Sequence, residues 1–245
     1  RGNIMFDQIS TPRNLRTQLG EHQTLTATPA SDRHLVEQPY LARRQNWTTQ
    51  LARHAMMQPD ARALRFLGQT TTWGELGRRV TSLAGALSRR GVEFGDRVLI
   101  LMLNRTEFLE SVLAVNQLGA IAVPVNFRMT PPEIAFLVED CAARVVITEP
   151  VLAVVATAVR ELDPTLADVI VAGGPTEDGT LGYEDLVAET GPAPAPVDIP
   201  DESPALIMYT SGTTGRPKGA VLTHVNLSGQ AMTALFTSGA DLNND

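Results

Sequence analysis

Between residues 97 and 172, short runs of apolar residues alternate with longer stretches in which apolar residues recur at helical spacing. The first run, Arg97–Leu103 (RVLILML), is apolar almost throughout, which is typical of a strand buried on both faces of a parallel sheet. Similar runs follow at Ile121–Val125, Arg144–Thr148 and Asp168–Ala172. Repeated strand–helix–strand units place parallel strands side by side and helices over the sheet. The sequence therefore predicts an α/β fold with a mostly parallel sheet and helices on both faces.

Helix start signals lie between these runs. Asn104 can cap a helix that contains Glu107 three residues later, and the sequence Thr-Pro-Pro-Glu at 130–133 is another helix start. A third helix is predicted over Val151–Leu162. These helices are the crossovers that the parallel strands require.

The stretch before the first run also has recognisable elements. Residues 64–72 alternate around Gly68-Gln69 and predict a hairpin. Thr72 and Glu75 match a capping box, which predicts a longer helix that ends at Gly91. Apolar residues at helical spacing predict a short helix further upstream, with Trp47, Leu51 and Ala55.

Pattern and composition divide the chain into four parts. Residues 1–45 show little sustained periodicity and predict a partly ordered N-terminal extension, whereas residues 46–190 predict an α/β subdomain. Residues 191–204 (GPAPAPVDIPDESP) contain five prolines and predict an irregular surface connector, because proline lacks a backbone N–H and fixes φ. Residues 205–245 predict a strand, a loop and a helix of an incomplete domain.

Composition excludes several protein classes. The 245 residues carry a formal net charge of −7, which argues against a nucleic-acid binder. The longest mainly apolar stretch, Val151–Val159, is half the ~18 residues of a membrane-spanning helix, so only peripheral membrane contact stays open. Residues 1–15 lack the apolar core of a secretory signal and Cys141 has no disulfide partner, so we expect a cytoplasmic protein. We expect no zinc site, because no metal-ligand spacing joins Cys141 to His22, His34 or His54.

The segment Thr210–Gly219 (TSGTTGRPKG) directly follows a predicted buried strand, Ala205–Tyr209. It holds three glycines and three threonines, and Lys218 is the only lysine among the 20 basic residues of the chain. Glycines let backbone amides converge on an anion, hydroxyls add donors, and an ammonium adds a compact positive charge. These residue types together predict a triphosphate cradle.

Two features separate this segment from the P-loop of nucleotidases. Pro217 precedes Lys218 and Gly219 follows it, whereas the P-loop requires Gly-Lys-Ser/Thr. Downstream, residues 220–222 predict a returning strand, and Thr223 predicts the cap of a helix that begins near His224. For the His224 side chain we expect a structural role. Composition alone leaves a second interpretation open, a Gly/Thr turn between two strands that binds nothing.

The run Tyr209–Gly219, followed by Val221–His224, resembles the phosphate-loop signature of the AMP-forming, acyl-adenylating superfamily. Residues 104–108 and 119–126 also resemble that superfamily, and the likeness covers about residues 46 to 236. Within it, residues 124–130 and 219–224 are most similar to bacterial fatty-acyl-CoA ligases.

The resemblance implies a two-step reaction with ATP, Mg²⁺ and coenzyme A. A carboxylate attacks the α-phosphate of ATP to give an acyl-adenylate and pyrophosphate, and the thiol of coenzyme A then displaces AMP. By the same resemblance, Lys218 would neutralise the β- and γ-phosphates, and the Thr210 hydroxyl is a candidate Mg²⁺ ligand. The residues that would wrap these phosphates are Thr210, Ser211, Gly212, Thr213, Thr214 and Gly215.

Superfamily members are much longer, and the resemblance implies that their catalytic lysine lies in a later C-terminal domain. The only lysine of this chain, Lys218, already belongs to the phosphate loop, so the catalytic lysine is not present. We therefore expect an N-terminal fragment that holds no catalytic residue and is inactive alone. Its expected partners are small-molecule substrates. We expect it to form a homo-oligomer or to associate through the cut face. Alternatives are adenylation of an aryl or amino acid, and a non-catalytic partner-binding module.

Overall fold

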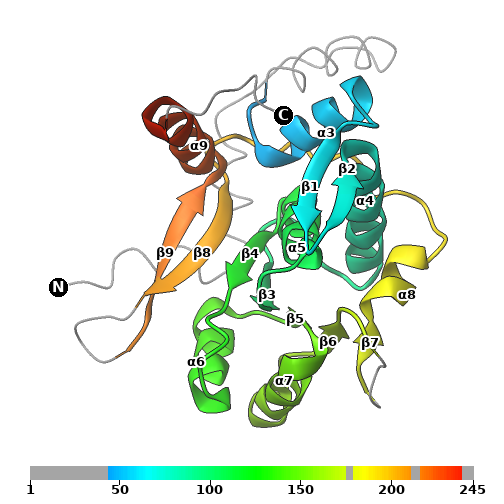
Figure 1. The fold of residues 1–245 in the computed structure, drawn as a ribbon. Helices are drawn as coiled ribbons and strands as arrows, with labels where there is room; N and C mark the ends of the chain where they lie inside the picture. The colour runs from blue at the N-terminus through cyan, green and yellow to red at the C-terminus, as the bar shows by residue number, and fades with distance from the viewer. Residues whose placement is uncertain (1–43, 175–178, 211–215, 239–245) are drawn as a thin grey trace, which may run out of the picture.

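A computed structural model of the chain describes residues 44–174, 179–210 and 216–238. Seven strands form one sheet at its centre (Figure 1). From edge to edge they are β7 (Leu181–Gly182), β6 (Asp168–Val171), β5 (Val145–Thr148), β3 (Arg97–Leu101), β4 (Ile121–Pro124), β8 (Pro204–Thr210) and β9 (Lys218–Thr223). Neighbouring strands are parallel except β8 and β9, which are antiparallel. The predicted α/β fold with a mostly parallel sheet is confirmed.

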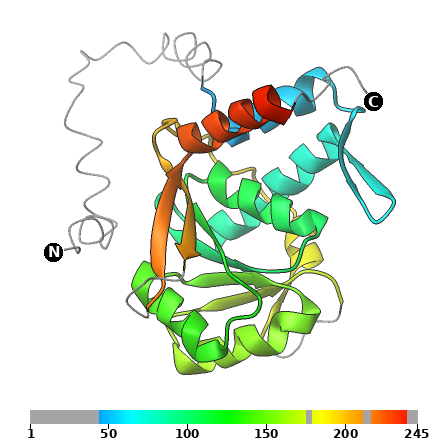
Figure 2. The same ribbon diagram turned by 60° about the vertical axis from the view of Figure 1, so that its left-hand side comes forward.

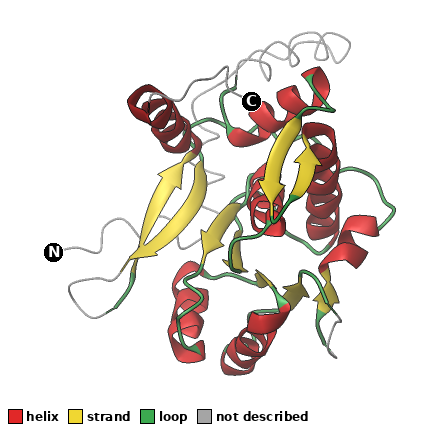
Figure 3. Ribbon diagram, in the orientation of Figure 1, coloured by secondary structure: helices red, strands yellow, loops and turns green. Residues whose placement is uncertain are grey.

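Helices cover both faces of the sheet (Figures 2 and 3). On one side lie α4 (Trp73–Arg89), α5 (Thr106–Gln117) and α8 (Tyr183–Ala188), and α3 (Trp47–Met57) packs on α4 and α5. On the other side lie α6 (Pro131–Cys141) and α7 (Pro150–Leu162). The small antiparallel hairpin of β1 (Arg62–Phe66) and β2 (Gln69–Thr72) precedes α4, and α9 (His224–Ser238) follows β9.

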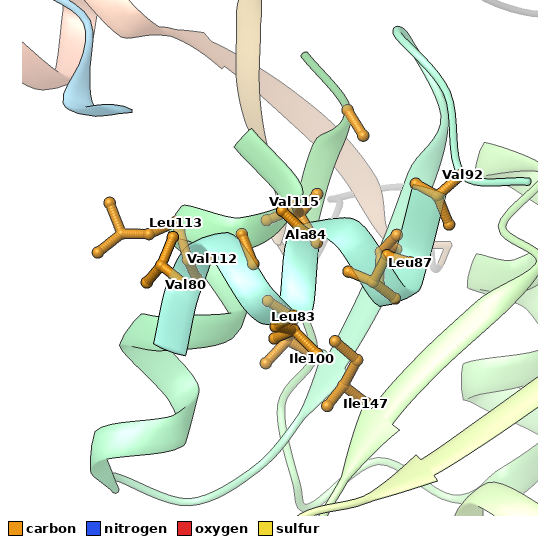
Figure 4. Packing of buried hydrophobic residues seen from close by; sticks show 14 of the residues in the cluster. Val80, Leu83, Ala84, Leu87, Val92, Ile100, Val112, Leu113, Val115 and Ile147 are labelled. Carbon is orange, nitrogen blue, oxygen red and sulfur yellow. The ribbon is translucent and has the colours of Figure 1, made fainter. Parts of the chain in front are cut away.

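The buried residues form two cores, one on each face of the sheet. All of β3 is buried, and because side chains alternate along a strand, Val98 and Ile100 join one core while Leu99 and Leu101 join the other. Figure 4 shows the first core, where α4 and α5 pack over the sheet. Its labelled residues include Val80, Leu83 and Leu87 of α4, Val112 and Val115 of α5, Ile100 of β3 and Ile147 of β5. The double-sided burial explains the continuous apolar runs.

Of the three helix caps predicted upstream of the phosphate loop, two are present. Thr130 and Glu133 form a reciprocal capping box at α6, and the Thr72 hydroxyl accepts a hydrogen bond from the Glu75 amide at 3.2 Å at α4. The prediction that Asn104 caps α5 is wrong. The N-cap is Arg105, whose side chain makes no capping hydrogen bond.

Residues 191–203 form no helix or strand and return the chain to the sheet. They are held where α3 begins: Asp198 pairs with Arg44 at 3.0 Å, and Nδ2 of the Asn46 side chain donates to the Ile199 carbonyl at 2.9 Å. At their end β8 enters the sheet beside β4, where Leu206 pairs with Ala122. These contacts fix the place from which the predicted phosphate loop extends.

Candidate functional site

The β8–β9 hairpin carries the predicted phosphate loop. Strand pairing places Thr210 opposite Lys218, and the Thr210 hydroxyl lies 3.5 Å from the Lys218 carbonyl oxygen. Both side chains are exposed, and Lys218 makes no ion pair with the residues that the structure describes. The other five predicted site residues, Ser211, Gly212, Thr213, Thr214 and Gly215, lie outside the described residues. The two that are described, Thr210 and Lys218, are paired across the hairpin where the loop begins and ends, a place called the neck of the loop below.

Gly219 has a steric role beside this neck. A Cβ atom added to Gly219 would lie 2.8 Å from Ile207 Cγ2 and 3.3 Å from the ring of Tyr209, its partner across the hairpin. Glycine therefore lets the Tyr209 ring approach the backbone of β9 closely. Packing therefore explains why the motif has a glycine directly after Lys218.

The hairpin also contacts α6 on both sides of the loop. Before the loop, the Tyr209 hydroxyl donates to Asp140 Oδ2 at 2.6 Å. After it, the Arg216 guanidinium lies over the Phe136 ring, 5.5 Å from its centroid. Sequence reasoning missed both partners, because they lie about 70 residues before the loop and belong to no local pattern.

At the other end of the hairpin, β9 leads into α9 through a reciprocal cap. The Thr223 amide donates to Asn226 Oδ1 at 3.0 Å, and the Asn226 amide donates to the Thr223 hydroxyl at 3.3 Å. His224 follows and is completely buried, and burial lowers its pKa to about 4 against the opposing charge of Asp201. A neutral, buried ring fits the structural role that the sequence indicates for His224.

A second group of charged residues lines a hollow of about 580 Å³ beyond the carboxyl ends of β3 and β5. Ion pairs join several of them: Arg79 lies 2.7 Å from Glu110, and Arg105 lies 2.7 Å from Glu107 and 3.4 Å from Glu149. The guanidinium of Arg105 lowers the pKa of Glu107 and keeps it ionised. The motif at 104–108 thus ties α5 to the loop after β5, and this pairing explains why Arg105 takes the cap position.

The described residues set limits on metals and membranes. Within residues 44–174, 179–210 and 216–238, no group of three or more His, Cys, Asp or Glu side chains is placed to hold a metal ion. No helix in this part of the chain is long and apolar enough to cross a membrane. An exposed ammonium and hydroxyl beside a close-packed glycine are nevertheless a donor set that suits phosphate oxygens.

The chain combines a mostly parallel α/β sheet with an antiparallel hairpin at its edge, and the sequence between the two hairpin strands is rich in glycine and threonine and precedes the only lysine, Lys218. Residues 51–244 match the family model described as AMP-binding enzyme, so the chain belongs to this family. The match confirms the resemblance drawn from residues 209–224.

Proteins of known name resemble the chain over most of its length. It is 40% identical over 183 residues to a feruloyl-CoA synthase from an Amycolatopsis species, covering 75% of this chain and 34% of that protein. It is 33% identical over 172 residues to a long-chain-fatty-acid–CoA ligase from Thermus thermophilus, covering 70% and 31%. The crystal structure of the anthranilate CoA ligase AuaEII in complex with anthranoyl-AMP superposes with a TM-score of 0.70 at 28% identity, covering 77% and 36%. The chain thus spans about a third of the length of the curated relatives it matches.

Proposed function

We propose that this chain supplies the triphosphate-binding part of an AMP-forming acyl-CoA ligase. In the first step a carboxylate oxygen bonds to the α-phosphorus of ATP, and the bond to the bridging oxygen breaks to release pyrophosphate. In the second step the sulfur of coenzyme A bonds to the acyl carbon, and AMP leaves as the thiol proton is lost. The observation that carries the proposal is the neck of the β8–β9 hairpin, where Thr210 and Lys218 face each other with exposed side chains.

The proposed site works by electrostatics. Lys218 would stabilise the charge that develops on the leaving pyrophosphate, and the residues at 211–215 would add backbone and hydroxyl donors. Mg²⁺ would neutralise further phosphate charge, with the Thr210 hydroxyl among its ligands. In this proposal residues 46–190 are the supporting α/β subdomain, 191–204 the connector, and 205–245 the part that carries the loop.

For the acyl group we propose a fatty acid. The runs at 124–130 and 219–224 support it, as does the similarity to the fatty-acid ligase of Thermus thermophilus. The second candidate is an aromatic carboxylic acid, which the 40% identity to a feruloyl-CoA synthase favours. Because we expect the 245-residue chain to be inactive alone, a pyrophosphate-release assay on a longer protein that contains this chain compares the classes, with ATP, Mg²⁺, and fatty, aromatic and amino acids. Release with fatty acids alone supports the first candidate, and release with aromatic acids alone overturns it.

The phosphate site itself is tested by binding. Inorganic tripolyphosphate and ATP are titrated, with Mg²⁺, into the 245-residue chain and into two variants, Lys218→Ala and Arg65→Ala. Arg65 is the matched control, an exposed cation of β1, a strand that lies away from the β8–β9 hairpin (Figure 1). Because a charge-assisted contact contributes about 1.5–3 kcal/mol, Lys218→Ala should weaken binding of both ligands by about 10-fold or more. Equal affinities for the two variants would contradict the proposal.

A further inference from the structure

We propose that α6 is a platform that positions the phosphate loop, with Asp140 and Tyr209 as its principal positioning residues. The inference rests on the proposed triphosphate site and adds to it a support from outside the motif. Asp140 and Tyr209 act on the ligand through the hairpin and need not touch it.

The geometry of α6 is the first argument. Phe136 and Asp140 are four residues apart on this helix, so they lie on one face about one turn apart. Asp140 holds Tyr209, which immediately precedes Thr210, and Phe136 holds Arg216, which lies two residues before Lys218. One helix face therefore contacts the chain just before and just after the loop.

The second argument is that the tip of the hairpin extends past the sheet. β8 pairs with β4 at Leu206, three residues before Tyr209, and β9 lies at the edge of the sheet. The strand ladder therefore holds the base of the hairpin more firmly than its tip. The contacts with α6 supply a second point of support at the tip.

The third argument is that the platform is itself firmly held. α6 is buried in the second core through Ile134, Leu137, Val138 and Cys141, and Cys141 also lies beside the Tyr209 hydroxyl. The Tyr209 ring is half-buried against the same core, and burial raises the pKa of its hydroxyl, which keeps the group protonated as a donor. A neutral phenol that donates to a carboxylate makes a short, charge-assisted hydrogen bond.

The experiment separates a charge effect of Asp140 from a positioning effect, because the two predict opposite changes in the affinity for tripolyphosphate. If Asp140 acted on phosphate only through its charge, Asp140→Ala would strengthen tripolyphosphate binding, because a nearby negative charge is removed. If Asp140 positions the loop, the same change weakens binding, and Tyr209→Phe, which changes no charge, also weakens it. We expect each variant to reduce the affinity for tripolyphosphate with Mg²⁺ by about 3- to 10-fold, and the double variant to bind like either single one.

Two further variants separate positioning from loss of structure. Asp140→Asn keeps an acceptor for the Tyr209 hydroxyl and should restore most of the affinity. Glu139→Ala removes an exposed acid from the neighbouring position of α6 and should not weaken binding. Circular dichroism and urea unfolding are recorded for every variant, and the effect must appear in chains that keep the wild-type spectrum and unfolding transition.

The outcomes are distinguishable from failure of the proposed function. Unchanged affinity in Tyr209→Phe beside weakened affinity in Lys218→Ala would overturn the platform and leave the phosphate site standing. Stronger binding in Asp140→Ala would overturn it in the same way. If Tyr209→Phe is too unstable to measure, Arg216→Leu tests the second contact with α6, that of Arg216 with Phe136. Wild-type affinity in Arg216→Leu would overturn the proposal that α6 supports the loop on both sides.

Discussion

Acid pH should destabilise this chain through His224, the completely buried residue at the start of α9. Neither ring nitrogen has a hydrogen-bond partner among the described residues, and burial lowers the pKa to about 4 from an ordinary value of 6.5. Asp201 lies near enough to favour the charged ring, but burial outweighs it. The folded state therefore excludes a proton that the unfolded chain accepts.

The sign and size follow from linkage. Above pH 6.5 the ring is neutral in both states and contributes no pH dependence. Between pH 6.5 and 4 only the unfolded chain binds the proton, so the free energy of unfolding falls as the pH falls. The interval of 2.5 pH units at about 1.4 kcal/mol each gives a limiting loss of about 3.5 kcal/mol, of which about 3 kcal/mol is reached at pH 4. Well below pH 4 both states are protonated and the loss does not grow.

Urea unfolding of the wild type and of His224→Leu at pH 7, 6, 5 and 4 measures this contribution. Other groups also respond to acid, such as Glu189, whose pKa is lowered to about 2 by Arg90 and Arg89, but they respond alike in both chains. The difference in unfolding free energy between the chains should therefore shift by about 3 kcal/mol in favour of the variant from pH 7 to pH 4. Parallel loss of stability in the two chains, or an NMR titration of the His224 ring near pH 6.5 in the folded state, would refute the reasoning.

Two more predictions concern the core and one turn. Burial raises the pKa of the Cys141 thiol to about 11. An aromatic disulfide reagent at pH 8 should therefore react with the native chain at least ~100-fold more slowly than with the urea-unfolded chain. Equal reaction rates would contradict this prediction. Gly119→Ala should destabilise the fold by about 2–4 kcal/mol in urea unfolding, since Gly119 has φ +69° and an added Cβ would lie 2.2 Å from the Phe94 ring. The control is Gly229→Ala in α9, where no described atom beyond the adjoining residues and backbone of α9 lies within 4 Å of the added Cβ and no comparable loss is expected.

The fold was predictable because its signals are local and strong. A strand such as β3, buried on both faces, must be apolar at successive positions, and few other structures require that pattern. The cap at Thr130 is equally local, since the helix and its partner Glu133 lie within four residues. Where the energy comes from neighbours in sequence, the sequence alone suffices.

The cap of α5 shows where such reasoning stops. Asn104 is a better N-cap residue than Arg105 by intrinsic preference. The Arg105 guanidinium, however, pairs with Glu107 and Glu149 and donates to the Ala172 carbonyl at 2.8 Å. Two of these partners follow the neighbouring strands β5 and β6, and only the fold brings them near. Tertiary contacts outweighed a local preference of about 1 kcal/mol.

The same division applies to the candidate site. A segment rich in glycine can surround a phosphate closely, but glycine loses more conformational freedom on ordering than any other residue. Rigidity for such a loop must therefore come from the residues that flank it and from what those residues touch. Tyr209 and Arg216 flank the loop, and their partners Asp140 and Phe136 belong to a helix fixed in the core. The motif can thus supply the chemistry of a phosphate site, while the precise placement of its donors depends on α6, a helix outside the motif.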